Sequence, residues 1–114
     1  IFLLMNNVFI PAKDSDGFLL DPSDWNIQHA ETVAKEFRTE LSKNHWIVIK
    51  YIRKYFDEHQ KVPELRYLLK YFKNEYGADK STRKYIYKLF PYGYGQQACK
   101  IAGMRQPKKL WLDL

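Results

Sequence analysis

The sequence predicts one mainly α-helical domain with a short N-terminal β-hairpin and an extended C-terminal arm. Three observations support this prediction. Apolar residues recur at helical spacing in several segments between positions 23 and 90, proline and glycine separate those segments, and "DSDG" forms a turn signal between two short apolar runs. We place the hairpin at 6–22, the helical body at 23–103 and the arm at 104–114. A chain of 114 residues, 46% hydrophobic, is sufficient for one modest core.

The stretch "NNVFIPAKDSDGFLL" predicts the hairpin. Apolar runs at 8–10 and 18–20 flank "DSDG", in which Gly17 supplies the positive φ that a tight turn often requires. The preceding "IFLLM" is too short for a signal-peptide core and has no basic residues before it. We interpret it as a strand or a frayed end, with Met5 a candidate native start.

Two amphipathic helices are predicted next. The first begins at a cap formed by Ser23 or Asp24 and extends to Leu41. The second begins after Ser42, and we expect His45, near its start, to have a structural role. Its apolar stripe contains Trp46, Ile49, Ile52 and Phe56.

Three shorter helices complete the predicted body. The third opens with Pro63 at its first position and ends at Gly77. The fourth covers 81–90, after which "PYGYG" interrupts the helical pattern. The fifth lies in "QQACKIAG" and ends at Gly103.

Cys99 is the only cysteine, which excludes an internal disulfide framework and argues against a cysteine-rich metal site. A reducing, cytoplasmic compartment is expected. The thiol is predicted within the first two turns of the fifth helix, where the helix dipole and the charge of Lys100 favour a thiolate. The alternative is a buried, inert cysteine that packs as a small hydrophobic residue.

The sequence predicts neither a metal site nor a cofactor. "DSDG" lacks the later acidic ligands of a calcium loop, and His29, His45 and His59 lie on separate predicted elements. A glycine-rich phosphate-binding motif is missing. Membrane association is not expected, because no stretch approaches the roughly 20 apolar residues of a membrane span.

The net charge of +6 is unevenly distributed. Residues 1–45 carry 4 Lys/Arg against 7 Asp/Glu, whereas residues 46–114 carry 15 against 6. The basic part predicts an anionic partner, either nucleic acid or an acidic protein cleft, with a solvated basic surface as the alternative. The candidate binding residues are Arg53, Arg66, Lys70, Arg83, Lys84, Lys88, Lys100 and Arg105.

The third and fourth helices also fit a helix-turn-helix pattern. In this interpretation the fourth helix presents its basic residues to phosphates and base edges, and the protein is a nucleic-acid-binding regulator. The exposed residues of that helix are then Thr82, Arg83, Lys84 and Lys88.

Four segments resemble the DsrC/TusE family of sulfur-relay proteins, in the same order over about residues 8–109. They are "DGFLLDPSDW", "LSKNHWIVIKYIRKYF", "VPELRYLLKYF" and "KYIYKLFPYGYGQQACKIAGMRQPKK". The resemblance implies a small helical domain with a short hairpin and a mobile C-terminal arm. It also implies a protein that accepts and hands on persulfide sulfur. Some members do so in tRNA 2-thiouridine synthesis, and others with dissimilatory sulfite reductase, whose active-site cleft the arm enters.

The resemblance also reveals a departure from the family pattern. In that family a penultimate arm cysteine bears the sulfur, and redox-active members have a second cysteine ten intervening residues upstream. Cys99 matches the upstream position, and Leu110 occupies the position of the arm cysteine. A leucine cannot hold a persulfide and one thiol cannot close an internal disulfide, so the two-cysteine cycle is unavailable to this chain.

Two hypotheses about sulfur relay therefore remain beside the nucleic-acid hypothesis. In the first, the protein is non-catalytic or regulatory and docks on sulfur-transfer or sulfite-reductase-type partners. In the second, Cys99 carries sulfur or forms a mixed disulfide, so that the protein is at most a sulfurtransferase-type carrier and not an enzyme by itself. For the first, the expected hydrophobic anchors of the arm, which alternatively pack on the protein's own core, are Leu110, Trp111, Leu112 and Leu114.

Overall fold

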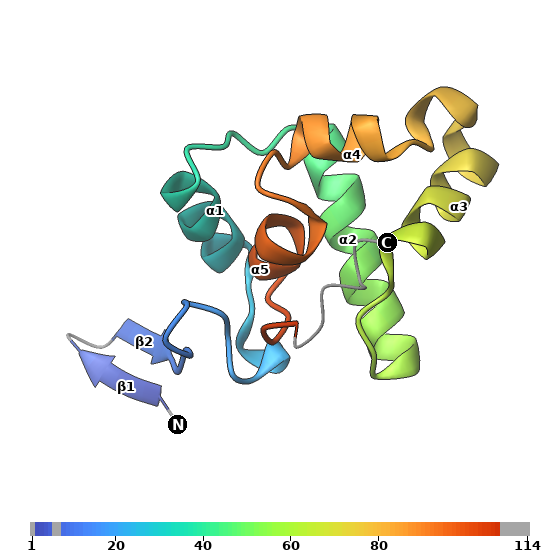
Figure 1. Cartoon of the computed structure of the whole chain (residues 1–114). Helices are drawn as coiled ribbons and strands as arrows, with labels where there is room; N and C mark the ends of the chain where they lie inside the picture. The colour runs from blue at the N-terminus through green and yellow to red at the C-terminus, as the bar shows by residue number, and fades with distance from the viewer. Residues whose placement is uncertain (1, 6–7, 108–114) are drawn as a thin grey trace.

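The computed structural model describes residues 2–5 and 8–107 and confirms the mainly helical class (Figure 1). None of the helices in these described ranges is long and apolar enough to cross a membrane. In chain order the elements are β1 (Phe2–Met5), β2 (Val8–Pro11), the 3₁₀ helix η1 (Pro22–Asp24), α1 (Ile27–Glu36), α2 (Lys43–His59), α3 (Leu65–Tyr76), the 3₁₀ helix η2 (Ala78–Lys80), α4 (Arg83–Leu89), the π-helical turn η3 (Tyr94–Ala98) and α5 (Cys99–Ile101).

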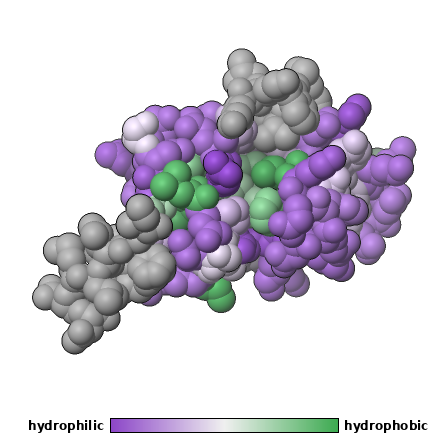
Figure 2. Space-filling view, turned by 90° about the horizontal axis from the view of Figure 1, so that it is seen from below, coloured by the Kyte–Doolittle hydropathy of each residue, from purple (hydrophilic) through white to green (hydrophobic). Residues whose placement is uncertain are grey.

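The short helix α5 lies at the centre of the helical body, between α1 and α2 (Figure 1). The core forms where the apolar stripes of α1 to α4 meet the segment from Tyr94 to Met104. On the face shown in Figure 2, the described surface is mostly hydrophilic, with small apolar patches. The core residues with no exposed surface include Val48, Ile49, Ile52, Leu65, Leu68, Ile86, Phe90, Tyr94, Ala98, Cys99, Ile101 and Met104.

The N-terminal hairpin uses different strands from those predicted. β1 and β2 pair antiparallel, with Phe2 opposite Pro11 and Met5 opposite Val8. The interpretation of "IFLLM" as a strand is thus confirmed for residues 2–5. The predicted second strand at 18–20 is reduced to a single antiparallel bridge, beside which the backbone N–H of Leu20 donates to the carbonyl of Ala12 at 3.2 Å.

The segment "DSDG" is a turn, as predicted, although it joins no strands. The carboxylate of Asp14 accepts hydrogen bonds from the backbone N–H groups of Asp16 and Phe18, both at 2.9 Å. Gly17 has φ of +87°, and a single bridge pairs Lys13 with Leu19. Phe18 and Leu19 are each 1% exposed, so this apolar run is buried against the helical body instead of continuing a sheet.

The first predicted helix is divided in two. The side chain of Asp21 caps η1, and that of Asn26 caps α1 by accepting a 2.7 Å hydrogen bond from the backbone N–H of His29. The predicted cap at Ser23 or Asp24 is wrong, because "PSD" forms a separate 3₁₀ turn.

Three other helix boundaries differ from prediction by a few residues. α1 ends at Glu36 and not at 41, since Arg38 adopts a φ of +56° that an α-helix does not allow. α3 begins at Leu65 rather than at Pro63, because Glu64 is its N-cap. α4 begins at 83 and not at 81, because the side chain of Thr82 caps it.

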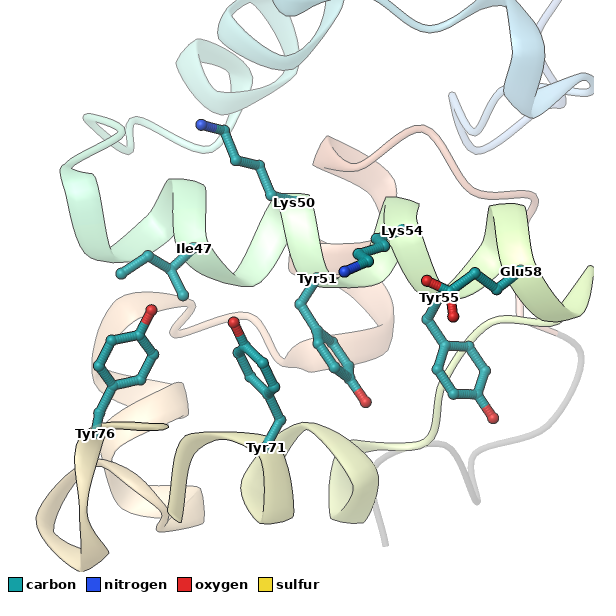
Figure 3. Close-up of a pocket in the computed structure, with 8 residues that line it drawn as sticks. All are labelled: Ile47, Lys50, Tyr51, Lys54, Tyr55, Glu58, Tyr71 and Tyr76. Carbon is teal, nitrogen blue, oxygen red and sulfur yellow. The ribbon is translucent and has the colours of Figure 1, made fainter. Parts of the chain in front are cut away.

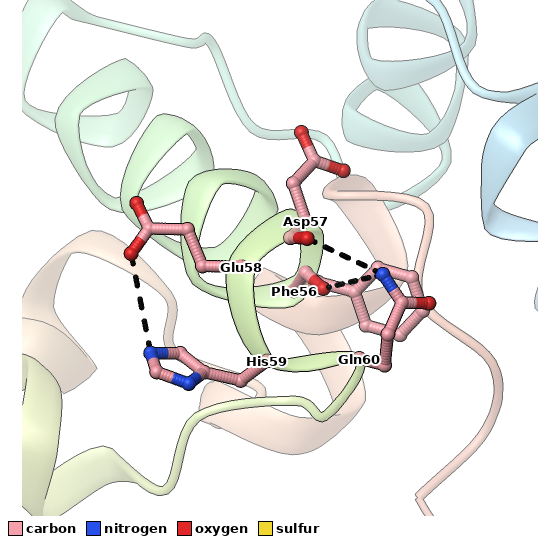
Figure 4. Close-up of polar contacts among 5 residues, drawn as sticks. All are labelled: Phe56, Asp57, Glu58, His59 and Gln60. Carbon is pink, nitrogen blue, oxygen red and sulfur yellow. Dashed lines mark hydrogen bonds and ion pairs between the residues drawn. The ribbon is translucent and has the colours of Figure 1, made fainter.

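Both ends of α2 are fixed by side chains. The backbone N–H of Ser42 donates to Nδ1 of His45 at 3.1 Å, which confirms the predicted start. The other ring nitrogen of His45 lies 2.8 Å from the carbonyl oxygen of Leu89, so His45 joins α2 to α4 and has the structural role expected. At the C-terminal end, Gln60 has φ of +55° and donates to the carbonyls of Phe56 and Asp57 (Figure 4).

Candidate functional site

The candidate site is the segment from Tyr94 to Ile101, which we call the cysteine helix. It begins after Gly93, which has φ of +105°, and the π-helical turn η3 continues directly into α5. Gly103, with φ of +78°, ends it near the predicted position. Single π turns are rare and are found disproportionately at functional sites.

The thiol of Cys99 is completely buried. The residue has 0% exposure and belongs to the main apolar core. A cysteine reacts as a thiolate that its reagent can reach. Chemistry at Cys99 therefore requires movement of the cysteine helix, and the geometry favours the buried alternative of the two considered from sequence.

The C-terminal end of the cysteine helix is held by two side chains from earlier in the chain. The indole N–H of Trp25 donates to the carbonyl of Ile101 at 2.9 Å. The guanidinium of Arg53 donates to the carbonyls of Ala102 at 2.8 Å and Pro22 at 3.0 Å, and it lies 4.4 Å from the Trp25 ring centre. Arg53 is thus turned into the molecule, which departs from its predicted place on a binding surface.

The N-terminal end of the cysteine helix is held by buried polar groups that the sequence analysis missed. The side-chain oxygen of Gln97 accepts from the backbone N–H of Tyr92, and its amide donates to the hydroxyl of Thr39, both at 2.8 Å. The hydroxyl of Tyr94 donates to the carbonyl of Pro63. The one feature of the sequence that could have indicated these contacts is Gln97, a polar residue in the otherwise largely apolar segment "QACKIAG".

His29 contributes an unusual buried imidazole beside this site. It is 8% exposed, and its Nε2 is buried with no hydrogen-bond partner among the described residues. Burial and the nearby charges of Lys13, Arg53 and Lys100 lower the pKa of His29 to about 4. His29 is therefore neutral at pH 7. Within residues 2–5 and 8–107, moreover, no group of three or more His, Cys, Asp or Glu side chains is placed to hold a metal ion.

Lys100 follows Cys99 in the sequence and is partly buried. Its ammonium group interacts with two aromatic rings. Its Nζ lies 5.5 Å from the ring centre of Phe18 and 5.4 Å from that of Phe37. Next to these rings is an open hollow of about 460 Å³. The residues that line it are Asp16, Phe18, Phe37, Tyr92, Gln96, Lys100 and Gln106.

The arm starts inside the core. Met104, its first predicted residue, is 0% exposed, and its backbone N–H donates to the carbonyl of Cys99 at 3.0 Å. The side-chain amide of Gln106 donates to the carboxylate of Asp16 at 2.8 Å. The expected anchors of the arm lie outside the described residues: Leu110, Trp111, Leu112 and Leu114.

The other predicted basic residues are exposed and are distributed over different elements. Arg66 and Lys70 lie on α3, with Arg66 2.8 Å from the carboxylate of Glu64, and Arg105 lies at the start of the arm. α4 presents Arg83, Lys84 and Lys88. The helix-turn-helix hypothesis for this helix stays a prediction.

A family model described as "DsrC like protein" matches residues 9–110. This chain belongs to the DsrC-like family. The match confirms the resemblance inferred from the four sequence segments and covers η1, all five α-helices and the cysteine helix.

Individual DsrC-like relatives match over most of their length. "Sulfurtransferase TusE" of Buchnera aphidicola subsp. Acyrthosiphon pisum is 43% identical over 97 residues, 85% of each chain. The protein of the same name from Pectobacterium atrosepticum is 37% identical over 98 residues, 86% of this chain and 90% of that one.

Solved structures of DsrC proteins have the same fold. The oxidized gamma-subunit of the dissimilatory sulfite reductase (DsrC) from Archaeoglobus fulgidus matches with a TM-score of 0.81 and 38% identity, covering 96% of this chain and 98% of that one. DsrC of Allochromatium vinosum matches with a TM-score of 0.79 and 35% identity, covering 95% and 96%.

Proposed function

We propose that this DsrC-like protein acts in a sulfur relay as an accessory protein that docks on sulfur-transfer or sulfite-reductase-type partners. The relatives are named as sulfurtransferases and as a sulfite reductase gamma-subunit, which supports a place in sulfur relay. One observation directs the proposal toward docking: the chain's only thiol has no exposed surface. By the resemblance, Leu110 stands at the position of the arm cysteine, and this supports a docking role in which the 114 residues offer a partner no accessible sulfur-holding group.

Docking is proposed to use the start of the arm and the surface beside it. Met104 and the bond between Gln106 and Asp16 fix the point from which the arm leaves the core. Arg105 is exposed at that point, and Lys100 lines the neighbouring hollow. A partner with an acidic rim suits Arg105 and Lys100, and apolar pockets on that partner suit the proposed arm anchor Trp111. Tryptophan and arginine dominate the binding energy of many protein interfaces.

A second candidate function is sulfur transfer through Cys99, which the sulfurtransferase names of the relatives favour. In this step the Cys99 thiolate attacks the terminal sulfur of a donor persulfide. The donor's sulfur–sulfur bond breaks, the donor leaves as a thiolate, and Cys99 gains a persulfide without an external oxidant. The helix must first open, which breaks the hydrogen bonds that Trp25 and Arg53 make to its end.

Intact mass spectrometry separates the two candidates. The folded full-length chain is incubated with inorganic polysulfide, with the Cys99→Ser variant as the control. Docking without transfer predicts no adduct on the native chain and an adduct of about +32 Da per sulfur atom only in denaturant. An adduct on the native protein that Cys99→Ser abolishes refutes the docking-only proposal and establishes the carrier.

Docking itself is measured by calorimetry with purified sulfur-relay proteins and sulfite reductase. The matched variant replaces Leu110, Trp111 and Leu112 by serine. Burial of a tryptophan and two leucines predicts a loss of affinity of at least about 30-fold in this variant. Unchanged affinity, or no binding to any of these partners by the wild-type chain, contradicts the proposal.

A further inference from the structure

Five tyrosines form a continuous row along the seam between α2 and α3, on a part of the molecule that the sulfur-relay proposal does not use. Consecutive ring centres are separated by 6.1, 6.1, 4.7 and 6.2 Å. Such contacts fix the rings relative to one another. From one end to the other, this tyrosine row consists of Tyr67, Tyr55, Tyr51, Tyr71 and Tyr76.

Four members of the tyrosine row, Tyr55, Tyr51, Tyr71 and Tyr76, line an open groove of about 370 Å³, within the lower part of the range of ligand sites, and Tyr67 continues the row beyond it. Figure 3 shows the rings of Tyr51 and Tyr55 descending from α2 and those of Tyr71 and Tyr76 rising from α3. Flat aromatic groups therefore occupy both walls of the groove.

The two ends of the row are exposed and each carries a cation. Tyr67 is 39% exposed with the guanidinium of Arg66 5.2 Å from its ring centre, and Tyr76 is 43% exposed with the ammonium of Lys80 at 5.9 Å. Lys50 and Lys54 of α2 also line the groove, and the ammonium of Lys50 points away from the rings (Figure 3). Cations therefore lie along the whole row.

The phenol groups add hydrogen-bond donors and no negative charge. Burial and neighbouring tyrosines raise the pKa of Tyr51 to about 12, and burial also raises the pKa of Tyr71. Both remain protonated at neutral pH. Glu58 is the one acidic residue among those described as lining the groove. Beyond the groove, Glu64 pairs with Arg66 at 2.8 Å, so a phosphate must displace that carboxylate to reach Arg66.

We propose that the tyrosine row binds single-stranded nucleic acid, with unpaired bases stacked on Tyr67 and Tyr76 and phosphates held by Lys54, Arg66 and Lys80. Aromatic side chains that alternate with cations along a groove are the usual means of holding a single strand without sequence preference. A duplex hides the faces of its bases and cannot use the row. An apolar peptide fits the rings but leaves the cations unmatched. This site is separate from the basic face of α4.

The test is fluorescence anisotropy of the full-length chain with labelled oligo(U) and oligo(dT) of about 12 nucleotides. Tyr67→Ala and Tyr76→Ala are each expected to weaken binding about 5- to 150-fold, the range for loss of one stacking ring. The matched control is Tyr92→Ala, because Tyr92 is 65% exposed and lies outside the row, where its ring packs 5.3 Å from that of Phe37. It is expected to leave affinity unchanged.

A charge variant tests the site independently of the aromatic substitutions. Binding is expected to weaken with salt, and Lys54→Gln should reduce the slope of log affinity against log salt by about 0.7, the value for one phosphate contact on a single strand. Circular dichroism confirms that each variant is folded.

Four results overturn the proposal. The first is an equal loss of affinity in Tyr92→Ala and Tyr76→Ala. The second is binding of the duplex as tight as that of the strand, and the third is binding of a mononucleotide as tight as that of the 12-mer. The fourth is no binding of single strands by the wild-type chain at low salt, and capture of a peptide in their place then assigns the groove to a protein partner.

Discussion

Replacing Gly103 by alanine is predicted to destabilise the junction between the cysteine helix and the arm. Gly103 has φ of +78°, where a side chain costs about 1–2 kcal/mol. An added Cβ would lie 2.4 Å from Cδ1 of Trp25 and 2.7 Å from its Cβ and Cγ. These atoms are at the base of the tryptophan, so rotation of the ring alone does not relieve the clash.

Displacement of Trp25 has a second cost. Its indole N–H loses the hydrogen bond to Ile101, about 1 kcal/mol, and overpacking adds about 1–3 kcal/mol. The total loss is therefore about 3–6 kcal/mol. At roughly 4 °C per kcal/mol, the Tm should fall by about 12–24 °C.

Gly77→Ala is the matched control for this experiment. Gly77 has φ of +93°, and an added Cβ meets nothing within 4 Å. The control loses only the backbone contribution, about 1–3 kcal/mol. Both variants are measured by thermal unfolding followed by circular dichroism. If Gly103→Ala lowers the Tm no more than Gly77→Ala does, the contact with Trp25 is not a structural constraint and the reasoning is wrong.

Three further predictions concern side chains around the site. The pKa of His29 is about 4 in the folded protein against 6.5 in the unfolded chain, so the unfolded state binds more protons between these pH values. The free energy of unfolding should therefore fall by about 1–2 kcal/mol, after allowance for solvent access, as the pH drops from 7 to 4. Urea titrations should show this slope reduced in His29→Leu, and an unchanged slope contradicts it. Arg53→Met should lower the free energy of unfolding by about 2–4 kcal/mol, because it removes the bonds to Ala102 and Pro22. The control Lys54→Met, on the exposed side of α2, should change it by less than about 0.5 kcal/mol. Equal losses of unfolding free energy in urea titrations of the two variants refute the bonding role of Arg53. Maleimide labelling of native Cys99 should be at least about 1,000-fold slower than in denaturant, and comparable rates exclude the buried thiol.

The fold was predictable where local signals agree with the core. α2 is the clearest case, because its apolar stripe and its start at Ser42 indicate the same helix. The start of α1 was not predictable, since Asp21, Ser23, Asp24 and Asn26 are all good capping residues and only tertiary packing selects among them. The prediction of a strand at 18–20 was wrong for a similar reason. This run is as apolar as a strand, and its burial against the helices is decided by residues distant in the sequence.

The position of Cys99 was predictable, but its burial was not. "QQACKIAG" is short and apolar on several sides, so its sequence does not show which side faces inward. That choice is made by Trp25 and Arg53, which hold its end from 76 and 49 residues away. Arg53 was misplaced for the same reason, because an arginine that bonds buried carbonyls has the same local pattern as an exposed one.

The π-helical turn sets the rotational phase of the segment that follows it. Each residue of a helix advances the chain by about 100°, and a π turn contains one residue more than an α turn. Because the π turn takes up its extra residue within Tyr94–Ala98, the helix that follows keeps a continuous register, and in that register the side chain of Cys99 faces the core.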